Sequence, residues 1–253
     1  MDLLAFVAIG VALGLSLGLF GGGGGILAIP LLVAAGLPAD EAGTTSLIVV
    51  AIGAAGGLIP HARAGRVAWT QGATFGALGI LGAVAGSRIA LVTDDAIQLW
   101  GFAVVLVVAG TLMMRKALRA SPAGNSSSPD GHRRSWPLIV VTAATVGLFT
   151  GFFGVGGGFL VVPALTLVMG MSMHRATATA LLVIIINSAA AFIPRAGEAL
   201  DAQVTGVVGI SVLVASALAA RWSNRWSNRS LGIGFAVLVL AMSVLTVSQA
   251  IGA

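Results

Sequence analysis

The feature that most constrains the fold is a glycine-rich motif that occurs twice. Residues 18–30 read GLFGGGGGILAIP and residues 151–163 read GFFGVGGGFLVVP. An offset of 133 positions, as between Gly21 and Gly154, aligns the two copies and also aligns flanking residues such as Thr44 with Thr177. The chain is therefore a duplicated unit. Each copy places glycines between apolar segments, where helical hydrogen bonding is expected to fail and to leave backbone N–H groups available to a ligand.

The composition excludes an ordinary soluble domain. Hydrophobic residues make up 58% of the 253 residues and charged residues 8%, whereas about a quarter of a soluble domain is charged. We therefore expect an integral membrane protein, with the lipid bilayer as a partner. The net charge is +5, but the basic residues lie at segment ends and in one linker, so no nucleic-acid partner is expected. The chain has no cysteine, and we expect neither a metal site nor a cofactor.

The apolar segments divide each half into full spans and a hairpin of two half-length or broken helices. The full spans are expected over residues 3–20, 67–87, 96–114, 138–153, 202–220 and 230–251. The arms of the two hairpins are expected over residues 26–37 and 44–59, and over residues 159–171 and 176–194. The predicted fold class is an all-α integral membrane protein with two inverted-topology repeats, each with a broken or re-entrant helical hairpin, and about 8 to 10 membrane helices or half-helices in total.

A segment rich in Ser, Pro, Gly and charge separates the two halves. We place the first transmembrane repeat at residues 1–116, a cytoplasmic linker at 117–135 and the second transmembrane repeat at 136–253. Each hairpin returns the chain to the side on which it starts, so each repeat makes an odd number of crossings and the repeats must be inverted.

The basic residues then predict an orientation. Ten of the thirteen basic residues fall on the side of the linker, and Arg88, Arg175 and Arg195 fall on the other. By the positive-inside rule we expect a multi-pass protein of the inner (plasma) membrane, with the linker in the cytoplasm and both termini outside.

Short, glycine-interrupted hydrophobic segments at matching places in inverted repeats are typical of a transporter site near the membrane midplane. Helix N-termini and hydroxyl donors there would favour a small anionic substrate. The candidate substrate-binding residues are the two glycine runs, the hydroxyls that open the second arm of each hairpin, and two further polar residues. They are Gly22, Gly23, Gly24, Gly25, Thr44, Thr45, Ser46, Gly156, Gly157, Gly158, Thr177, Thr179, Asn187 and Arg175.

Other interpretations of these residues stay open. Glycines can instead serve close helix packing, as we expect for pairs such as Gly14 with Gly18 and Gly82 with Gly86. Thr and Ser in membrane helices can bond their own backbone, and Asn187 is either a helix-to-helix contact or a ligand donor.

Four more basic residues are placed with less specific roles. Arg88 and Arg221 are expected to extend to their own membrane interfaces. Arg195 and His61 are candidates for opposite mouths of the path. The eight carboxylates fall at termini, elbows or loops, so a facilitator or weakly coupled exporter is expected.

The duplicated motif, followed in each half by a Thr/Ser-rich helix start, resembles the TauE/SafE family of sulfite and organosulfonate exporters. The resemblance covers nearly the whole chain outside the linker, and it implies that Gly21–Gly25, Gly154–Gly158, Thr44–Ser46 and Thr177–Thr179 line the path. Val155 and Ala178 make the two half-sites unequal.

The function implied is export of a small sulfur-containing anion, sulfite or a short organosulfonate such as sulfoacetate, by alternating access between the repeats. A homodimer is compatible with the resemblance. An anion-selective channel and a transporter of another small organic acid remain alternatives. Enzyme activity is not expected, because the chain lacks a His-Glu-x-x-His motif and paired aspartates within a span.

Overall fold

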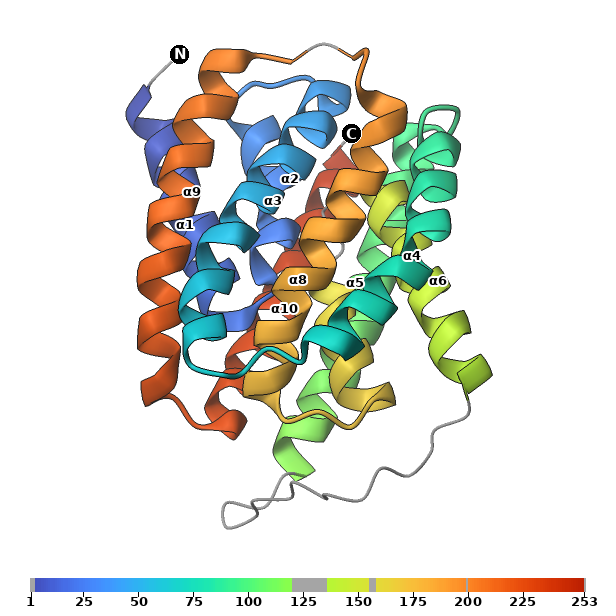
Figure 1. The fold of residues 1–253 in the computed structure, drawn as a ribbon. Coiled ribbons are helices and arrows are strands. Elements are labelled where there is room, and N and C mark those ends of the chain that lie inside the picture. Colours follow the sequence, from blue (N-terminus) through green and yellow to red (C-terminus); the bar gives the residue numbers. More distant parts are fainter. Residues whose placement is uncertain (1–2, 120–135, 155–157, 199, 253) are drawn as a thin grey trace.

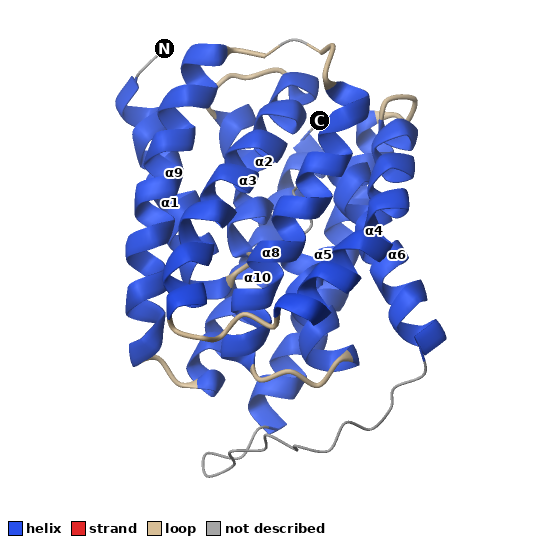
Figure 2. Cartoon of the chain, in the orientation of Figure 1, coloured by secondary structure: helices blue, strands red, loops and turns tan. Residues whose placement is uncertain are grey.

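The structure, a computed structural model, describes residues 3–119, 136–154, 158–198 and 200–252, and these ranges consist of helices and connecting loops without strands (Figures 1 and 2). The helices of the first half are α1 (Leu3–Phe20), α2 (Gly23–Ala34), α3 (Ala39–Arg63), α4 (Trp69–Ala90) and α5 (Asp95–Arg119). Those of the second half are α6 (Trp136–Phe153), α7 (Gly158–Pro163), the π-helical turn η1 (Ala164–Val168), α8 (Met173–Phe192), η2 (Ile193–Arg195), α9 (Ala202–Trp222), η3 (Ser223–Arg225) and α10 (Asn228–Gly252).

Eight of the described helices are long and apolar enough to cross a membrane. The two shorter apolar segments, Gly23–Ala34 and Gly158–Val168, are the first arms of the two hairpins. The predicted all-α membrane fold is confirmed. The chain is a multi-span membrane protein.

The second arms of the two hairpins match the prediction to different degrees, because α3 extends beyond its predicted bounds at both ends, whereas α8 lies within three residues of them. α3 has 25 residues and α8 has 20, so each is a full span rather than half of one. α3 runs through Pro60 because this proline lies in the last turn, where its missing N–H removes only the bond to Gly56 O. The prediction of two half-length arms is therefore wrong for the second arm and holds for the first.

Helices of one half pack along helices of the other. α1 packs along α9, α4 along α6, and α5 along α10. Glycines permit these approaches, because a Cβ on Gly14 would lie 2.6 Å from Ala215 Cβ and a Cβ on Gly86 would lie 2.8 Å from Phe152 N. The prediction that these glycines serve helix packing is confirmed.

The two ends of the helix bundle can be distinguished by the helix ends that lie at each of them. The start of α1 and the end of α10 lie at one end, and the end of α5 and the start of α6 lie at the other (Figure 1). We call the latter the linker end and the former the terminal end. α5 runs to Arg119, three residues into the predicted linker.

Arg175 lies at the linker end. The neighbouring His174 N–H donates to Asn228 Oδ1 at 3.1 Å, and His174 Nε2 lies 3.3 Å from Ser223 O, in the connection between α9 and α10. The prediction that Arg175 falls on the side opposite the linker is wrong, because the elbow before α8 lies at the linker end.

Candidate functional site

Each glycine motif breaks the helical path at the same position of the repeat. Gly21 follows α1 with φ of 71°, and Gly154 follows α6 with φ of 63°. This left-handed backbone favours glycine, which has no Cβ to clash. The break in the first half covers Gly21 and Gly22, and α2 begins at Gly23. The open backbone is therefore shorter than the glycine run suggests.

The two breaks meet inside the protein. A Cβ on Gly158 would lie 2.7 Å from Gly22 Cα, and a Cβ on Gly22 would overlap the Gly158 carbonyl. A Cβ on Gly21 would likewise lie 2.7 Å from Thr177 Cα, at the start of α8. A Cβ on Gly154 would lie 3.5 Å from Gly43 Cα, near the start of α3. Each break thus packs against the second hairpin arm of the other half.

The remaining predicted glycines of the first half lie in α2 rather than in the break. Cβ atoms on Gly23 and Gly24 would meet α1, the latter 2.6 Å from Leu13 O. These two glycines therefore serve the close packing of α2 on α1. Gly25 is buried in the same turn of α2, whereas Gly156 and Gly157 lie outside the described residues.

The predicted hydroxyls of α3 are buried and have different partners. Ser46 Oγ donates to Gly154 O and so connects α3 to the break of the other half. Thr44 Oγ1 donates to Glu198 Oε2 at 2.9 Å. Thr45 Oγ1 has no hydrogen-bond partner among the described residues. A buried hydroxyl without a partner is unfavourable unless water or a ligand bonds it.

The hydroxyls of α8 show the same division. Thr179 Oγ1 accepts a hydrogen bond from Ala68 N, directly before α4, at 3.1 Å. Thr177 Oγ1 is buried and has no partner in the described part of the chain. Among the hydroxyls predicted for the site, those without a partner in the described residues are therefore Thr45 and Thr177, and Thr177 lies against the break at Gly21.

Asn187 is buried in α8 with its amide turned towards α4. A Cβ on Gly79 would lie 2.9 Å from Asn187 Oδ1. Neither Oδ1 nor Nδ2 has a hydrogen-bond partner among the described residues, and the same holds for Ser188 Oγ. This position needs water or a solute to satisfy the amide.

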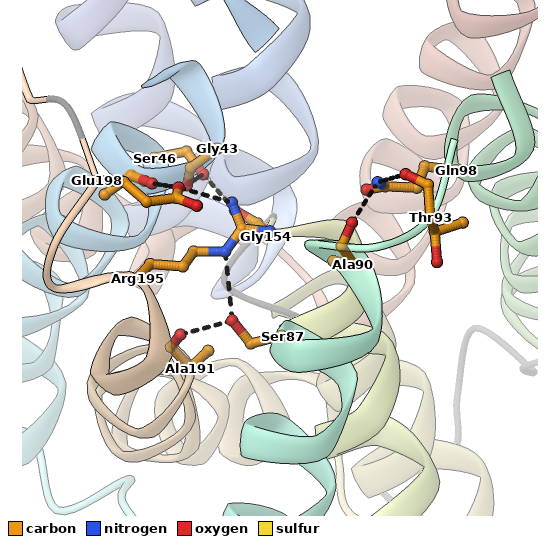
Figure 3. A network of polar contacts seen from close by, with 11 residues as sticks. Gly43, Ser46, Ser87, Ala90, Thr93, Gln98, Gly154, Ala191, Arg195 and Glu198 are labelled. Carbon is orange, nitrogen blue, oxygen red and sulfur yellow. Dashed lines mark hydrogen bonds and ion pairs between the residues drawn. The ribbon is translucent and has the colours of Figure 1, made fainter. Parts of the chain in front are cut away.

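A buried cation, Arg195, lies beside Glu198 (Figure 3). Arg195 is 6% exposed, and its Nε donates to Ser87 Oγ at 3.2 Å, while Ser87 Oγ donates to Ala191 O at 2.8 Å. Arg195 Nη1 lies 4.0 Å from Glu198 Oε2, the oxygen that accepts from Thr44. The site therefore contains a guanidinium and a carboxylate in addition to backbone and hydroxyl donors.

Sequence reasoning missed Ser87 and Glu198. The repeat gave no signal for Glu198, because the offset of 133 pairs it with Gly65. A signal was present for another missed pair, Phe102 and Phe235, which the same offset aligns. Phe20 lies 6.4 Å from Phe235 between ring centroids, and Phe153 lies 5.2 Å from Phe102. The motif phenylalanine of each half thus packs on the other half.

The other predicted polar residues lie outside this cluster. His61 is buried in α3, with Nε2 3.2 Å from Gly18 O. Arg88, Arg175 and Arg221 are exposed near helix ends, as expected of arginines that extend to a membrane interface. Among the residues that the structure describes, no three His, Cys, Asp or Glu side chains gather as a metal site would require.

Comparisons with known proteins agree with this architecture. The family model described as "Sulfite exporter TauE/SafE" matches residues 6–246. A "Probable membrane transporter protein" of Xylella fastidiosa (strain Temecula1) is 32% identical over 96% of this chain and 94% of its own length. Another protein of that name, from strain 9a5c, is 36% identical over 72% of this chain and 70% of its own length. No solved structure matches the chain. The chain is a membrane transporter that belongs to the sulfite exporter TauE/SafE family.

Proposed function

We propose that the protein exports a small sulfur-containing anion, sulfite or a short organosulfonate such as sulfoacetate. The substrate binds between the two halves, which have inverted topology, and reaches the two sides of the plasma membrane by alternating access. The linker lies in the cytoplasm and both termini lie outside. The family match supports the substrate class, and the arrangement of the two helix breaks supports the mode of binding.

The observation that carries the proposal is the meeting of the two breaks at Gly22 and Gly158. The first N–H groups of α2 have no partner within the helix, and the positive end of the helix dipole lies there. Thr45 and Thr177 add two buried hydroxyls without partners among the described residues. Donors without acceptors favour a solute rich in acceptor oxygens, which sulfite and sulfonates are.

Arg195 strengthens the preference for an anion. Its guanidinium is buried, with Nη1 4.0 Å from Glu198 Oε2. In a low-dielectric interior this cation attracts an anionic solute from a longer distance than backbone dipoles do. Small residues along the α1–α9 and α4–α6 contacts keep the halves close, and a rocking motion of one half against the other fits this kind of packing.

Removal of the two unpartnered hydroxyls tests the site. Thr45→Val and Thr177→Val keep the side-chain shape, so their unfolding midpoints without ligand should equal or exceed that of the parent protein. Stabilisation by sulfite or sulfoacetate, measured as the shift in midpoint, should fall by at least half in each variant. Flux of the same anion from proteoliposomes should fall with it.

Thr205→Val is the matched control, since Thr205 in α9 also has a buried hydroxyl without a described partner but was not assigned to the site. It should keep the full ligand-induced shift. If Thr45→Val and Thr177→Val also keep the full shift for every anion offered, the proposed site is wrong. A short carboxylate in the same series distinguishes a transporter of another organic acid, and large single-channel currents would indicate a channel.

A further inference from the structure

A groove between α3 and α9 opens on the surface of the helix bundle, near the linker end. It encloses about 550 Å³, and its lining includes Gly56, Ile59, Arg63, Leu213, Leu218 and Arg221. The walls are apolar except for one arginine on each helix. α3 belongs to the first half of the chain and α9 to the second, so the groove lies on the seam between the halves.

The groove begins beside a close contact between the two helices. Ser216 Oγ donates to Gly53 O at 2.7 Å, and a Cβ on Gly56 would lie 2.7 Å from Ser216 Oγ. These small residues let α3 and α9 meet at that level. From Gly56 to Arg63 the groove extends along α3 for about 10 Å at 1.5 Å per residue. Arg63 and Arg221 lie at the end of the groove that is nearer the linker end.

Side chains that line the groove are exposed on the surface of the helix bundle. Ile59 is 54% exposed and Leu218 is 51% exposed, on helices that are long enough to span a bilayer. Arg63 and Arg221 are also exposed. No carboxylate of the described side chains lies within 4.0 Å of either arginine. The groove thus combines apolar walls that fit a hydrocarbon chain with two cations that have no anionic partner among the described side chains.

We propose that this groove binds an anionic phospholipid. The phosphate of the headgroup lies between Arg63 and Arg221, and one acyl chain follows the groove towards Gly56. Charge complementarity selects the headgroup, because basic side chains between membrane helices attract anionic lipids. The bound lipid bridges the two halves of the transporter. The proposal does not depend on which anion is transported.

Native mass spectrometry of the purified, delipidated protein tests the proposal. The probes are phosphatidylglycerol and phosphatidylcholine with the same acyl chains, and inorganic phosphate without a lipid. We expect phosphatidylglycerol to bind and phosphatidylcholine to bind at least tenfold more weakly. The double variant Arg63→Gln/Arg221→Gln should bind phosphatidylglycerol about thirtyfold more weakly, about fivefold for each arginine.

The control is the double variant Arg225→Gln/Arg229→Gln, which removes the same charge from exposed arginines at the same end of the molecule. It should keep the affinity of the parent. Equal losses in both double variants would overturn the proposal, because they would indicate general attraction to a basic surface. So would full retention by Arg63→Gln/Arg221→Gln.

A second variant keeps the arginines and changes the groove. Ala217 lines the groove and is half-buried, so Ala217→Phe should fill part of it and weaken phosphatidylglycerol binding at least fivefold. This variant decides the question if the double variant does not fold. Unchanged binding by Ala217→Phe, or competition by inorganic phosphate that displaces the lipid completely, would show that no acyl chain occupies the groove.

Discussion

The protein places a carboxylate of its own, that of Glu198, beside two groups that could bind an anion. These groups are the Thr44 hydroxyl and the Arg195 guanidinium. Thr44 donates to the same Glu198 oxygen that lies 4.0 Å from Arg195. A hydroxyl donor and a guanidinium beside each other are the groups that a sulfonate or sulfite would be expected to bind. If the substrate anion binds at the proposed site, the Glu198 carboxylate competes with it for these donors.

Glu198→Gln should raise the affinity of the protein for anions. The amide can still accept from Thr44, but it no longer neutralises Arg195. The sulfite or sulfoacetate concentration that gives half of the maximal thermal shift should fall by about threefold to tenfold, a modest effect because Glu198 is 28% exposed and screened by water. Asp94→Asn removes an exposed carboxylate at the same end and should leave this concentration unchanged. Weaker anion binding by Glu198→Gln would contradict the competition.

At the scale of elements, the turn between α1 and α2 depends on both backbone conformation and close approach. Gly21 has a left-handed backbone and also packs on Thr177 of α8. Gly65, between α3 and α4, has nearly the same φ, 67°, but nothing lies within 4 Å of the position that its Cβ would take. Substitution of each glycine by alanine therefore separates the free-energy cost of a left-handed backbone from the cost of a steric clash.

Gly65→Ala should lower the free energy of unfolding by about 1–2 kcal/mol, the cost of a left-handed backbone in a residue with a Cβ. Gly21→Ala should cost at least twice as much, because its Cβ must also displace the α8 backbone at Thr177. Denaturation of the purified variants in one detergent measures both costs. Equal costs would show that the break at Gly21 yields easily and does not hold the two halves together.

At the scale of the whole molecule, the basic residues gather at one end. The ends of α3, α5 and α9 and the start of α8 lie at the linker end (Figure 1), and they carry Arg63, Arg119, Arg221 and Arg175. The correction of Arg175 thus adds an eleventh basic residue to the ten that were assigned to the linker side. Among the described residues, the charge asymmetry that the positive-inside rule uses is therefore larger than the sequence alone predicted.

The orientation can be measured with single cysteines, because the chain has none. Val92 is 86% exposed at the terminal end, and Ser227 is exposed at the linker end. A membrane-impermeant maleimide should label the Val92→Cys variant in intact cells. It should label the Ser227→Cys variant only after permeabilisation. The reverse pattern would place the linker outside and would contradict the predicted direction of the transporter.

Most of the fold could be predicted from the sequence. Hydrophobic runs of membrane length locate α1, α4, α5, α6, α9 and α10 within a few residues, because hydropathy is a local property of the chain. The end of α3 could not be predicted from Pro60, because this helix continues to Arg63, whereas α8 ends at Phe192, two residues before Pro194. A proline ends a helix or is tolerated in its last turn according to what surrounds it.

The sequence by itself determined that the protein is a duplicated membrane transporter with glycine breaks and nearby hydroxyls. Repeats, hydropathy and glycine content can be identified from the order of the amino acids alone. Only the tertiary structure decided which hydroxyls are available. Ser46 and Thr179 are used by Gly154 O and Ala68 N, whereas Thr45 and Thr177 have no described partner. These partners come from the other half of the chain, more than a hundred residues away in sequence. Hydrogen bonding depends on which atoms packing brings together, and no local pattern encodes that.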